Sequence, residues 1–164
     1  LPAHIPTLAE LYAECGNDFD VSLDMKTPDA YEPVAEVVRA QGFDVPGRTW
    51  LCAPDLDRLV ERRDSLADFR LVHSTRLAKL TVTPELHAAR LAELGVDVMN
   101  MHQTDWNGGL VVLFHRFGIL AFSWDLQFDH QLEDALRMGV DAVYSDHVDT
   151  MMDAMAREVG RSGA

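Results

Sequence analysis

The chain has 164 residues, of which 48% are hydrophobic and 25% are charged, the usual balance of a globular protein that can bury one core. Its 27 acidic residues outnumber the 14 basic ones and give a net charge of −13. A nucleic-acid-binding face needs clustered basic side chains. The only such group, Arg58, Arg62 and Arg63, is typical of a solvated helix face, so nucleic acid is not an expected partner.

The cysteine content and the hydropathy indicate the compartment. Cys15 and Cys52 match no zinc motif, resemble packing residues and do not suggest a secreted disulfide framework. No hydrophobic run approaches the roughly 20 residues of a membrane-spanning helix, and no signal peptide is visible. We therefore expect a cytoplasmic protein without a transmembrane segment. The acidity is typical of a soluble surface, and an acidic cleft that holds a divalent cation is the alternative.

Hydrophobic periodicity and capping signals predict a leading helix and then six strand–helix units. Thr7 and Glu10 form a capping box for a helix over 8–14, within a leading segment 1–18. The units occupy residues 19–160. The predicted strands are 19–25, 48–53, 69–73, 96–102, 119–124 and 140–145. The predicted helices are 30–41, 56–65, 83–94, 104–117 (a second choice weakened by Gly108 and Gly109), 128–138 and 147–159, and Asp146 is the expected N-cap of the last one.

The alternation of strands and helices predicts a parallel sheet. Gly95, Gly118 and Gly139 each end a helix just before a hydrophobic strand, which is typical of a short helix-to-strand turn. Residues 74–83 are either a loop or a broken helix. Two architectures remain open, a doubly wound open sheet and a (β/α)₈ barrel. The barrel is favoured because no glycine-rich phosphate turn follows a strand and because polar residues recur at strand ends. Residues 1–164 then form a single α/β domain with about six of the eight units of a TIM barrel.

Four predicted strands end in polar or aromatic side chains, and these are the candidate site residues. Asp24 and Lys26 are two apart on one strand and therefore point to the same face. A carboxylate suits a hard cation, and a lysine ammonium suits a phosphate oxygen. A solvated ion pair is the alternative for these two. The other strand ends carry Asn100 and His102, Trp124 and Asp125, and Ser145 and Asp146.

Four motifs in order resemble the glycerophosphodiester phosphodiesterase family. They are IPTLAE at residues 5–10, a strand ending Asp24-Met25-Lys26, a strand that follows Gly118 and ends at Trp124, and GVDAVYSD at residues 139–146. The match runs from near residue 5 to near residue 155, nearly the whole chain. Each motif alone is weak, but their order and spacing are fairly specific.

The resemblance implies a TIM barrel of the phosphodiesterase superfamily that hydrolyses small-molecule glycerophosphodiesters to glycerol 3-phosphate and an alcohol. It implies a divalent cation, Ca²⁺ or Mg²⁺, with Asp24 as a metal ligand and Lys26 as a phosphate contact. Trp124 would line the substrate pocket, with core packing as the alternative. His102 is a further candidate for substrate binding, with a hydrogen-bonded strand-end histidine as the alternative. The remaining histidines, including His73 and His87, are expected on the surface or in packing positions.

The sequence departs from the family pattern in three places. Asp24 stands where the family has glutamate, and Trp124 is followed by Asp125-Leu126-Gln127 instead of Thr-Val-Asn. The family's early His-Arg pair, Glu-x-Asp pair and second histidine are not found and would lie before Leu1, so no catalytic residue is assigned. A non-catalytic relative that binds a phosphate ester or lipid headgroup is therefore the alternative function, and an unrelated barrel enzyme is a third. Six strands would leave two sheet edges, so a homo-oligomer is possible.

Overall fold

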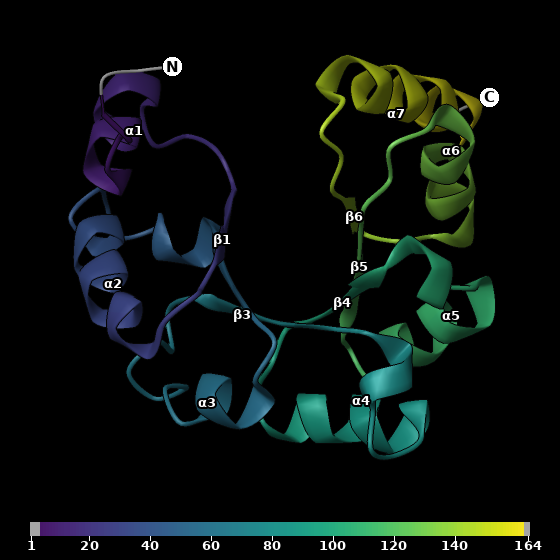
Figure 1. Cartoon of the computed structure of the whole chain (residues 1–164), viewed down its shortest axis with the longest axis horizontal. Coiled ribbons are helices and arrows are strands. Elements are labelled where there is room, and N and C mark those ends of the chain that lie inside the picture. Colours follow the sequence, from purple (N-terminus) through teal and green to yellow (C-terminus); the bar gives the residue numbers. More distant parts are fainter. Residues whose placement is uncertain (1–3, 163–164) are drawn as a thin grey trace. The chain divides into compact units, whose positions relative to one another are not determined.

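The computed structural model describes residues 4–162 and contains the strand–helix repeat that the sequence predicts (Figure 1). The residues group into two compact units, Leu1–Val72 and His73–Ala164. The boundary between the units falls inside the third strand, β3 (Arg70–Thr75). The prediction of a single domain stays a prediction.

The first unit is a parallel sheet with helices between its strands. β1 and β2 pair in parallel, with Val21 opposite Thr49 and Asp24 opposite Cys52, and the strand order is β1-β2-β3. The largest fully buried side chains are leucines on β2, α3 and β3 and in the segment between α3 and β3, and their burial is the main stabilising contribution. The elements before β3 are α1 (Leu8–Cys15), β1 (Val21–Asp24), η1 (Pro28–Ala30), α2 (Tyr31–Arg39), η2 (Pro46–Arg48), β2 (Thr49–Ala53) and α3 (Leu56–Val60).

The start of the first unit follows the sequence prediction closely. The Thr7 hydroxyl accepts the Glu10 N–H at 3.2 Å, and the Glu10 carboxylate accepts the Thr7 N–H at 2.7 Å, so the capping box is confirmed. The Met25 N–H donates to the Cys52 carbonyl at 2.8 Å and continues the pairing one residue beyond β1. Cys52 is buried as expected, but Cys15 is exposed at the end of α1 and is not a packing residue.

The second unit repeats the same arrangement with strand order β4-β5-β6. The parallel register sets Val98 opposite Leu120 and His102 opposite Trp124, and then Ser123 opposite Val143. Helices α6 and α7 pack side by side (Figure 1). The elements after β3 are η3 (Leu77–Lys79), α4 (Pro84–Glu93), β4 (Val98–His102), η4 (Gln103–Asp105), α5 (Gly108–Arg116), β5 (Leu120–Trp124), α6 (Asp129–Met138), β6 (Ala142–Val143) and α7 (Val148–Ser162).

The three predicted glycine junctions are confirmed. Gly95, Gly118 and Gly139 have φ values of 68°, 73° and 87°, in the left-handed region that an L side chain rarely adopts. The next strand begins two or three residues after each glycine, at Val98, Leu120 and Ala142. These turns give the repeat its regular spacing.

Two uncertain segments each contain a short 3₁₀ turn, and the second also contains the helix α5. β3 continues to Thr75, and η3 follows it within the segment 74–83. The predicted helix 104–117 is instead η4 followed by α5, because the Asn107 side chain caps α5 by accepting the Leu110 N–H at 3.0 Å. Gly108 and Gly109 then occupy the first turn of α5, where glycine costs less than in a helix interior.

The predicted N-cap of the last helix is wrong. α7 begins at Val148, and its first intrahelical hydrogen bond runs from the Met151 N–H to the His147 carbonyl at 2.9 Å. Asp146 therefore lies one residue too early to cap the helix. Its carboxylate instead accepts a hydrogen bond from the Gln127 amide at 3.0 Å.

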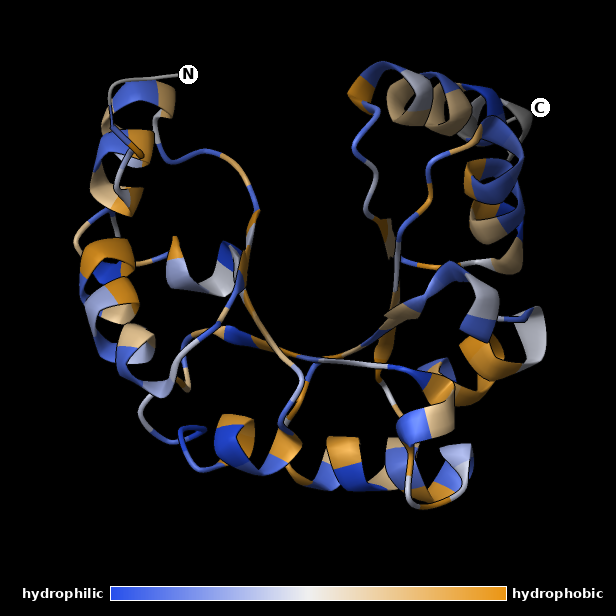
Figure 2. Cartoon of the chain, viewed as in Figure 1, coloured by the Kyte–Doolittle hydropathy of each residue, from blue (hydrophilic) through white to orange (hydrophobic). Residues whose placement is uncertain are grey.

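The helices carry both hydrophobic and hydrophilic residues, as expected for helices that pack against a sheet. Figure 2 shows hydrophobic and hydrophilic residues together on each helix, as expected for helices that bury one face. Among the described residues, none of the helices combines the length and the hydrophobicity that crossing a membrane would require.

A pair of buried histidines joins β3 to α4 in the second unit. His73 Nδ1 and His87 Nε2 are 3.1 Å apart, and both residues are 5% exposed, so of the two expected settings, surface or packing, these histidines have the second. One of the two nitrogens must donate a proton and the other must accept it, so the contact holds only while one of them is unprotonated. Burial, and to a smaller extent the charge of Arg90, lowers the pKa of His87.

We expect the protein to lose stability as the pH falls from 7.5 to 5.5. The pKa of His87 is lower in the folded chain than in the unfolded chain, where it is about 6.5. The unfolded chain therefore binds more protons below that pH, and acid favours unfolding. His87→Gln removes this titration and keeps an amide opposite His73, so its urea midpoint should change less between the two pH values. His130→Gln, at an exposed position, is the control and should keep the wild-type dependence. Equal pH dependence in His87→Gln and wild type would contradict the prediction.

Candidate functional site

The first candidate pair, Asp24 and Lys26, lies at the end of β1 in the first unit. Lys26 Nζ donates a hydrogen bond to Asp24 Oδ2, as expected for side chains two apart on a strand. The lysine and aspartate side chains are 78% and 55% exposed, so solvent screens the pair and it adds little to stability. The hydrogen bond and the charge of Asp24 raise the pKa of Lys26 and keep the ammonium protonated. The pair therefore presents a protonated ammonium next to a carboxylate to solvent, with no net charge.

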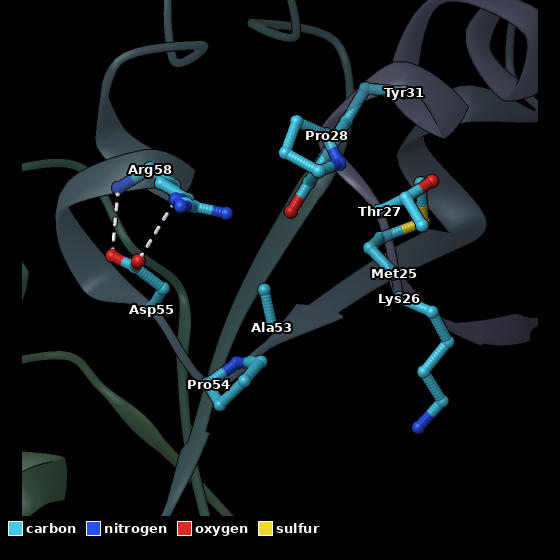
Figure 3. Close-up of a pocket in the computed structure, with 9 residues that line it drawn as sticks. All are labelled: Met25, Lys26, Thr27, Pro28, Tyr31, Ala53, Pro54, Asp55 and Arg58. Atoms are coloured by element: carbon cyan, nitrogen blue, oxygen red, sulfur yellow. Dashed lines mark hydrogen bonds and ion pairs between the residues drawn. The ribbon is translucent and has the colours of Figure 1, made fainter.

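A small cavity of about 80 Å³ adjoins Lys26 in the same unit. Figure 3 shows Asp55 and Arg58 paired on one side of it, with the Lys26 amine extending away from them. Arg58 Nε lies 3.1 Å from Asp55 Oδ2. The remaining lining includes Tyr31 and Ala53. A space of this size has room for a few water molecules.

The second candidate pair, His102 and Trp124, lies at the ends of β4 and β5 in the second unit. The parallel register places the two residues opposite one another, and their rings meet edge to face with centroids 4.7 Å apart and planes at 82°. This geometry is favourable for aromatic pairs. The structure therefore brings together these two predicted substrate-binding residues, and separately it brings together Asp24 and Lys26.

Hydrogen bonds at both ring nitrogens fix the His102 tautomer. The backbone N–H of Thr104 donates to His102 Nδ1 at 3.2 Å, and the Thr104 hydroxyl oxygen lies 2.8 Å from the same nitrogen. A backbone N–H can only donate, so Nδ1 is the acceptor and the ring proton is on Nε2. Nε2 lies 3.0 Å from Asp125 Oδ2 and donates to it. His102 therefore holds Asp125 in place instead of offering a nitrogen to a ligand.

Asp125 is the residue that this arrangement presents to solvent. It has φ 66°, and among the described residues it is the only non-glycine residue with positive φ. Such backbone strain is concentrated at functional sites, although aspartate tolerates it better than most residues. Gln127 and His102 donate hydrogen bonds to its carboxylate and lower its pKa, so Asp125 is ionised at neutral pH.

Arg76 and Asp105 form a two-point ion pair next to His102. Arg76 Nε and Nη2 lie 2.6 Å and 3.1 Å from the two carboxylate oxygens of Asp105, and the Leu77 N–H also donates to this carboxylate at 3.0 Å. The guanidinium lowers the pKa of Asp105 and lies 6.0 Å from the centroid of the Trp124 ring. The pair joins the turn after β3 to the turn after β4 and fixes the surroundings of Trp124.

Gln127 connects the end of β5 to the end of β6. Its amide nitrogen donates to Asp125 Oδ1 at 3.2 Å and to Asp146 Oδ2 at 3.0 Å, and its amide oxygen accepts the Asp146 N–H at 3.2 Å. A groove of about 610 Å³ opens beside these residues. Trp124 and Tyr144 contribute aromatic rings to its lining, and Asp125 and Asp146 contribute carboxylates.

Sequence reasoning missed Arg76, Asp105 and Gln127, and it assigned Asp146 to a helix cap. Arg76 and Asp105 are 29 residues apart, so no local pattern connects them. A signal was nevertheless present, because each charged residue lies shortly after a predicted strand, where the C-terminal ends of parallel strands meet. Arg76 falls in the segment that the sequence left open between a loop and a broken helix.

The described residues do not by themselves form a divalent-cation site. Among residues 4–162, no three His, Cys, Asp or Glu side chains lie together in a way that could hold a metal ion. Asp24 is the predicted ligand, and its carboxylate is paired with the Lys26 ammonium. A Ca²⁺ site takes six to eight oxygen ligands, so Asp24 can supply only part of one.

Neither a protein-family model nor a curated protein matches the chain in sequence. Solved structures do match its fold. A Silicibacter pomeroyi protein assigned as a glycerophosphoryl diester phosphodiesterase matches 94% of this chain with 57% of its own length, at 19% identity and a TM-score of 0.80. An Oleispira antarctica phosphodiesterase, solved with the product sn-glycerol-3-phosphate, matches 92% of this chain with 61% of its own, at 18% identity and a TM-score of 0.74.

A third solved structure with a similar fold was solved with c-di-GMP. A Bacillus subtilis protein with an EAL domain, solved with its substrate c-di-GMP and calcium, matches 99% of this chain with 51% of its own. The identity is 13% and the TM-score is 0.62. This chain therefore spans little more than half the length of these three structures.

The matches show that the chain has the fold of part of a TIM barrel. Within that class it is the fold of the glycerophosphodiester phosphodiesterases over part of their length. The predicted fold class and the resemblance that the sequence motifs indicate are thus confirmed at the level of the fold.

The His102–Asp125 contact gives a direct prediction about charge. Gln127 and His102 both lower the pKa of Asp125, so His102→Phe should raise that pKa toward the unperturbed value of about 3.9 while Gln127 keeps part of the effect. The pKa can be measured by ¹³C NMR titration of the Asp125 carboxyl group. His115→Phe is the matched control, since the imidazole of His115 contacts Asp141 at 2.7 Å and not Asp125. An Asp125 pKa that stays unchanged in His102→Phe would show that the contact is not formed in solution.

Proposed function

We propose that this chain is the phosphodiester-binding part of a glycerophosphodiester phosphodiesterase, whose reaction is metal-dependent hydrolysis of a glycerophosphodiester to glycerol 3-phosphate and an alcohol. The observation that supports this most directly is that, within each unit, polar or aromatic side chains stand at the C-terminal ends of parallel strands. Lys26 follows β1, and His102 and Trp124 end β4 and β5. Barrel enzymes build their sites from such strand ends.

The proposed roles follow from the chemistry of each side chain. Lys26 is exposed and protonated, and it contacts the phosphate as a compact positive charge. Trp124 forms an apolar wall for the non-phosphate part of a substrate. His102 contributes through Asp125, because both of its nitrogens already have hydrogen-bond partners within the protein.

The divalent cation, Ca²⁺ or Mg²⁺, is part of the proposal only as a group that Asp24 helps to bind. When bound, such a cation supplies Lewis-acid stabilisation of charge on a phosphoryl group. Further ligands beyond the described residues are required, and Asp24 must exchange its contact with Lys26 for the metal. Calorimetric titration with Ca²⁺ compares the wild-type chain with Asp24→Asn. The variant should bind Ca²⁺ more weakly, because it lacks the Asp24 carboxylate.

A non-catalytic relative that binds a phosphate ester or a lipid headgroup is the second candidate function. It is favoured by one observation, namely that Asp24 is paired with Lys26 and no metal-binding group of three side chains occurs among the described residues. A cytoplasmic location is proposed alongside either function, since both cysteines are free thiols. We also propose that the chain forms a homo-oligomer in which the sheet edges of different copies pair.

Lys26 offers a sharp test because the chain has only one other lysine, Lys79. We expect the chain to bind sn-glycerol 3-phosphate, and Lys26→Met to weaken this binding about tenfold, the loss expected for one charge-assisted hydrogen bond. Lys79→Met removes the same charge from an exposed position and should leave the affinity within about twofold, as expected for a surface charge. Calorimetry at low and moderate salt measures both variants.

The same preparations separate the two candidate functions. Release of glycerol 3-phosphate from glycerophosphocholine in the presence of Ca²⁺ or Mg²⁺ would support the enzyme. Binding without release would support the non-catalytic relative. Equal affinity of wild type and Lys26→Met for glycerol 3-phosphate would contradict the proposed contact between Lys26 and the phosphate.

A further inference from the structure

A chain of hydrogen bonds runs from the turn after β3 to the groove beside β5 and β6. Arg76 Nη2 donates to the Thr104 hydroxyl oxygen at 3.3 Å, and this hydroxyl lies 2.8 Å from His102 Nδ1. His102 Nε2 then donates to Asp125 Oδ2 at 3.0 Å. Asp125 and its neighbour Trp124 belong to the lining of the groove, whereas the other three residues do not. The chain of hydrogen bonds therefore connects an arginine outside the groove to a carboxylate inside its lining.

Every hydrogen bond of this chain points in the same direction, toward Asp125. The Thr104 N–H donates to His102 Nδ1 at 3.2 Å, so this nitrogen is an acceptor and the Thr104 hydroxyl must donate its proton to it. The hydroxyl oxygen then accepts the proton of Arg76. Donors that are aligned in one direction polarise one another, which strengthens each hydrogen bond. The positive charge of Arg76 at one end and the negative charge of Asp125 at the other favour this direction.

Further contacts fix both ends of the chain of hydrogen bonds. Arg76 is held by the two-point ion pair with Asp105, at 2.6 Å and 3.1 Å, and the Asp105 side chain is only 12% exposed. Asp125 is held by Gln127, which donates to its other carboxylate oxygen at 3.2 Å. The His102 side chain in the middle is 15% exposed, so little solvent competes for its hydrogen bonds. The imidazole therefore has one preferred orientation.

The orientation of His102 determines where the Trp124 ring can lie. The two rings meet edge to face with centroids 4.7 Å apart, and the Arg76 guanidinium lies 6.0 Å from the centroid of the same indole ring. Trp124 Nε1 is buried and has no hydrogen-bond partner within the part of the chain that the structure describes. No hydrogen bond of its own therefore fixes the indole, and its position depends on these two neighbours.

We propose that Arg76 and Thr104 are positioning residues that set the Trp124 ring and the Asp125 carboxylate through His102. The inference rests on the proposed function, in which Trp124 forms a wall for the non-phosphate part of a substrate. A wall that is held in place before the ligand arrives loses less conformational freedom on binding, so affinity depends on residues that do not touch the ligand. The sequence gives no local sign of this role, because Arg76 and Thr104 are 28 residues apart.

The geometry is tested first in the whole chain without a ligand. Thr104→Val keeps the size of the side chain but removes the hydroxyl, whereas Thr104→Ser keeps the hydroxyl. In NMR spectra, Thr104→Val should move the His102 Nδ1 signal toward that of a nitrogen with fewer hydrogen bonds and should weaken the NOEs between the His102 and Trp124 rings. Thr104→Ser should keep the wild-type values. Thr81→Val, at an exposed position before α4, is the matched control and should also keep them.

Binding is tested with two probes, sn-glycerol 3-phosphate and inorganic phosphate. Thr104→Val should weaken glycerol 3-phosphate binding about threefold, as expected for the loss of one hydrogen bond, and should leave the phosphate affinity within about twofold. Arg76→Lys keeps the charge but cannot form the two-point ion pair, so it should reproduce this pattern. Arg116→Lys, at an exposed position on α5, is its matched control and should leave both affinities unchanged.

The outcomes separate this inference from the proposed function. Ring NOEs that change equally in Thr104→Val and Thr104→Ser, or that change in neither, would overturn the positioning role. An equal loss of glycerol 3-phosphate and phosphate binding in Arg76→Lys would also overturn it, since Arg76 would then contact the phosphate directly. A wild-type chain that binds neither probe would contradict the proposed function, and the ring NOEs would still decide the positioning role.

Discussion

The parallel pairing of β4 with β5 is the constraint on which the polar groups of the second unit depend. His102 lies opposite Trp124 only in the observed register, and a shift by one residue would turn each side chain to the other face of the sheet. Burial of Met99, Met101 and Ala121 on these strands makes such a shift costly. The hydrophobic core thereby determines that an imidazole meets an indole ring and a carboxylate at the strand ends.

Much of the fold could be predicted because its signals are local. The capping box at Thr7, the glycines that end the helices and the hydrophobic strands each act within a few residues, and all of them are found in the structure. The errors arose where a local signal had two structural solutions. Asp146 resembles an N-cap but bonds to Gln127, and the segment 104–117 contains a second start signal at Asn107 that divides it.

The candidate site was less predictable, since its contacts join distant parts of the sequence. Asp24 and Lys26 could be paired from their spacing, whereas His102 and Trp124 were singled out separately without any indication that their rings touch. The network that surrounds them runs from Arg76 through Asp105 and from His102 to Asp125, and only the pairing of the strands brings these groups together. Sequence patterns identify which residues end the strands, but the sheet determines which of them interact.

The left-handed backbone at Asp125 limits how position 125 can evolve. At φ 66° most side chains would add about 1–2 kcal/mol of strain, whereas Asp, Asn and Gly are tolerated. Aspartate and asparagine codons differ by one base, so one nucleotide change can remove this negative charge with little cost to the backbone. Glutamate, which would keep the charge, is disfavoured by the same strain. One mutational step can therefore remove a negative charge from the lining of this groove while the backbone stays unchanged.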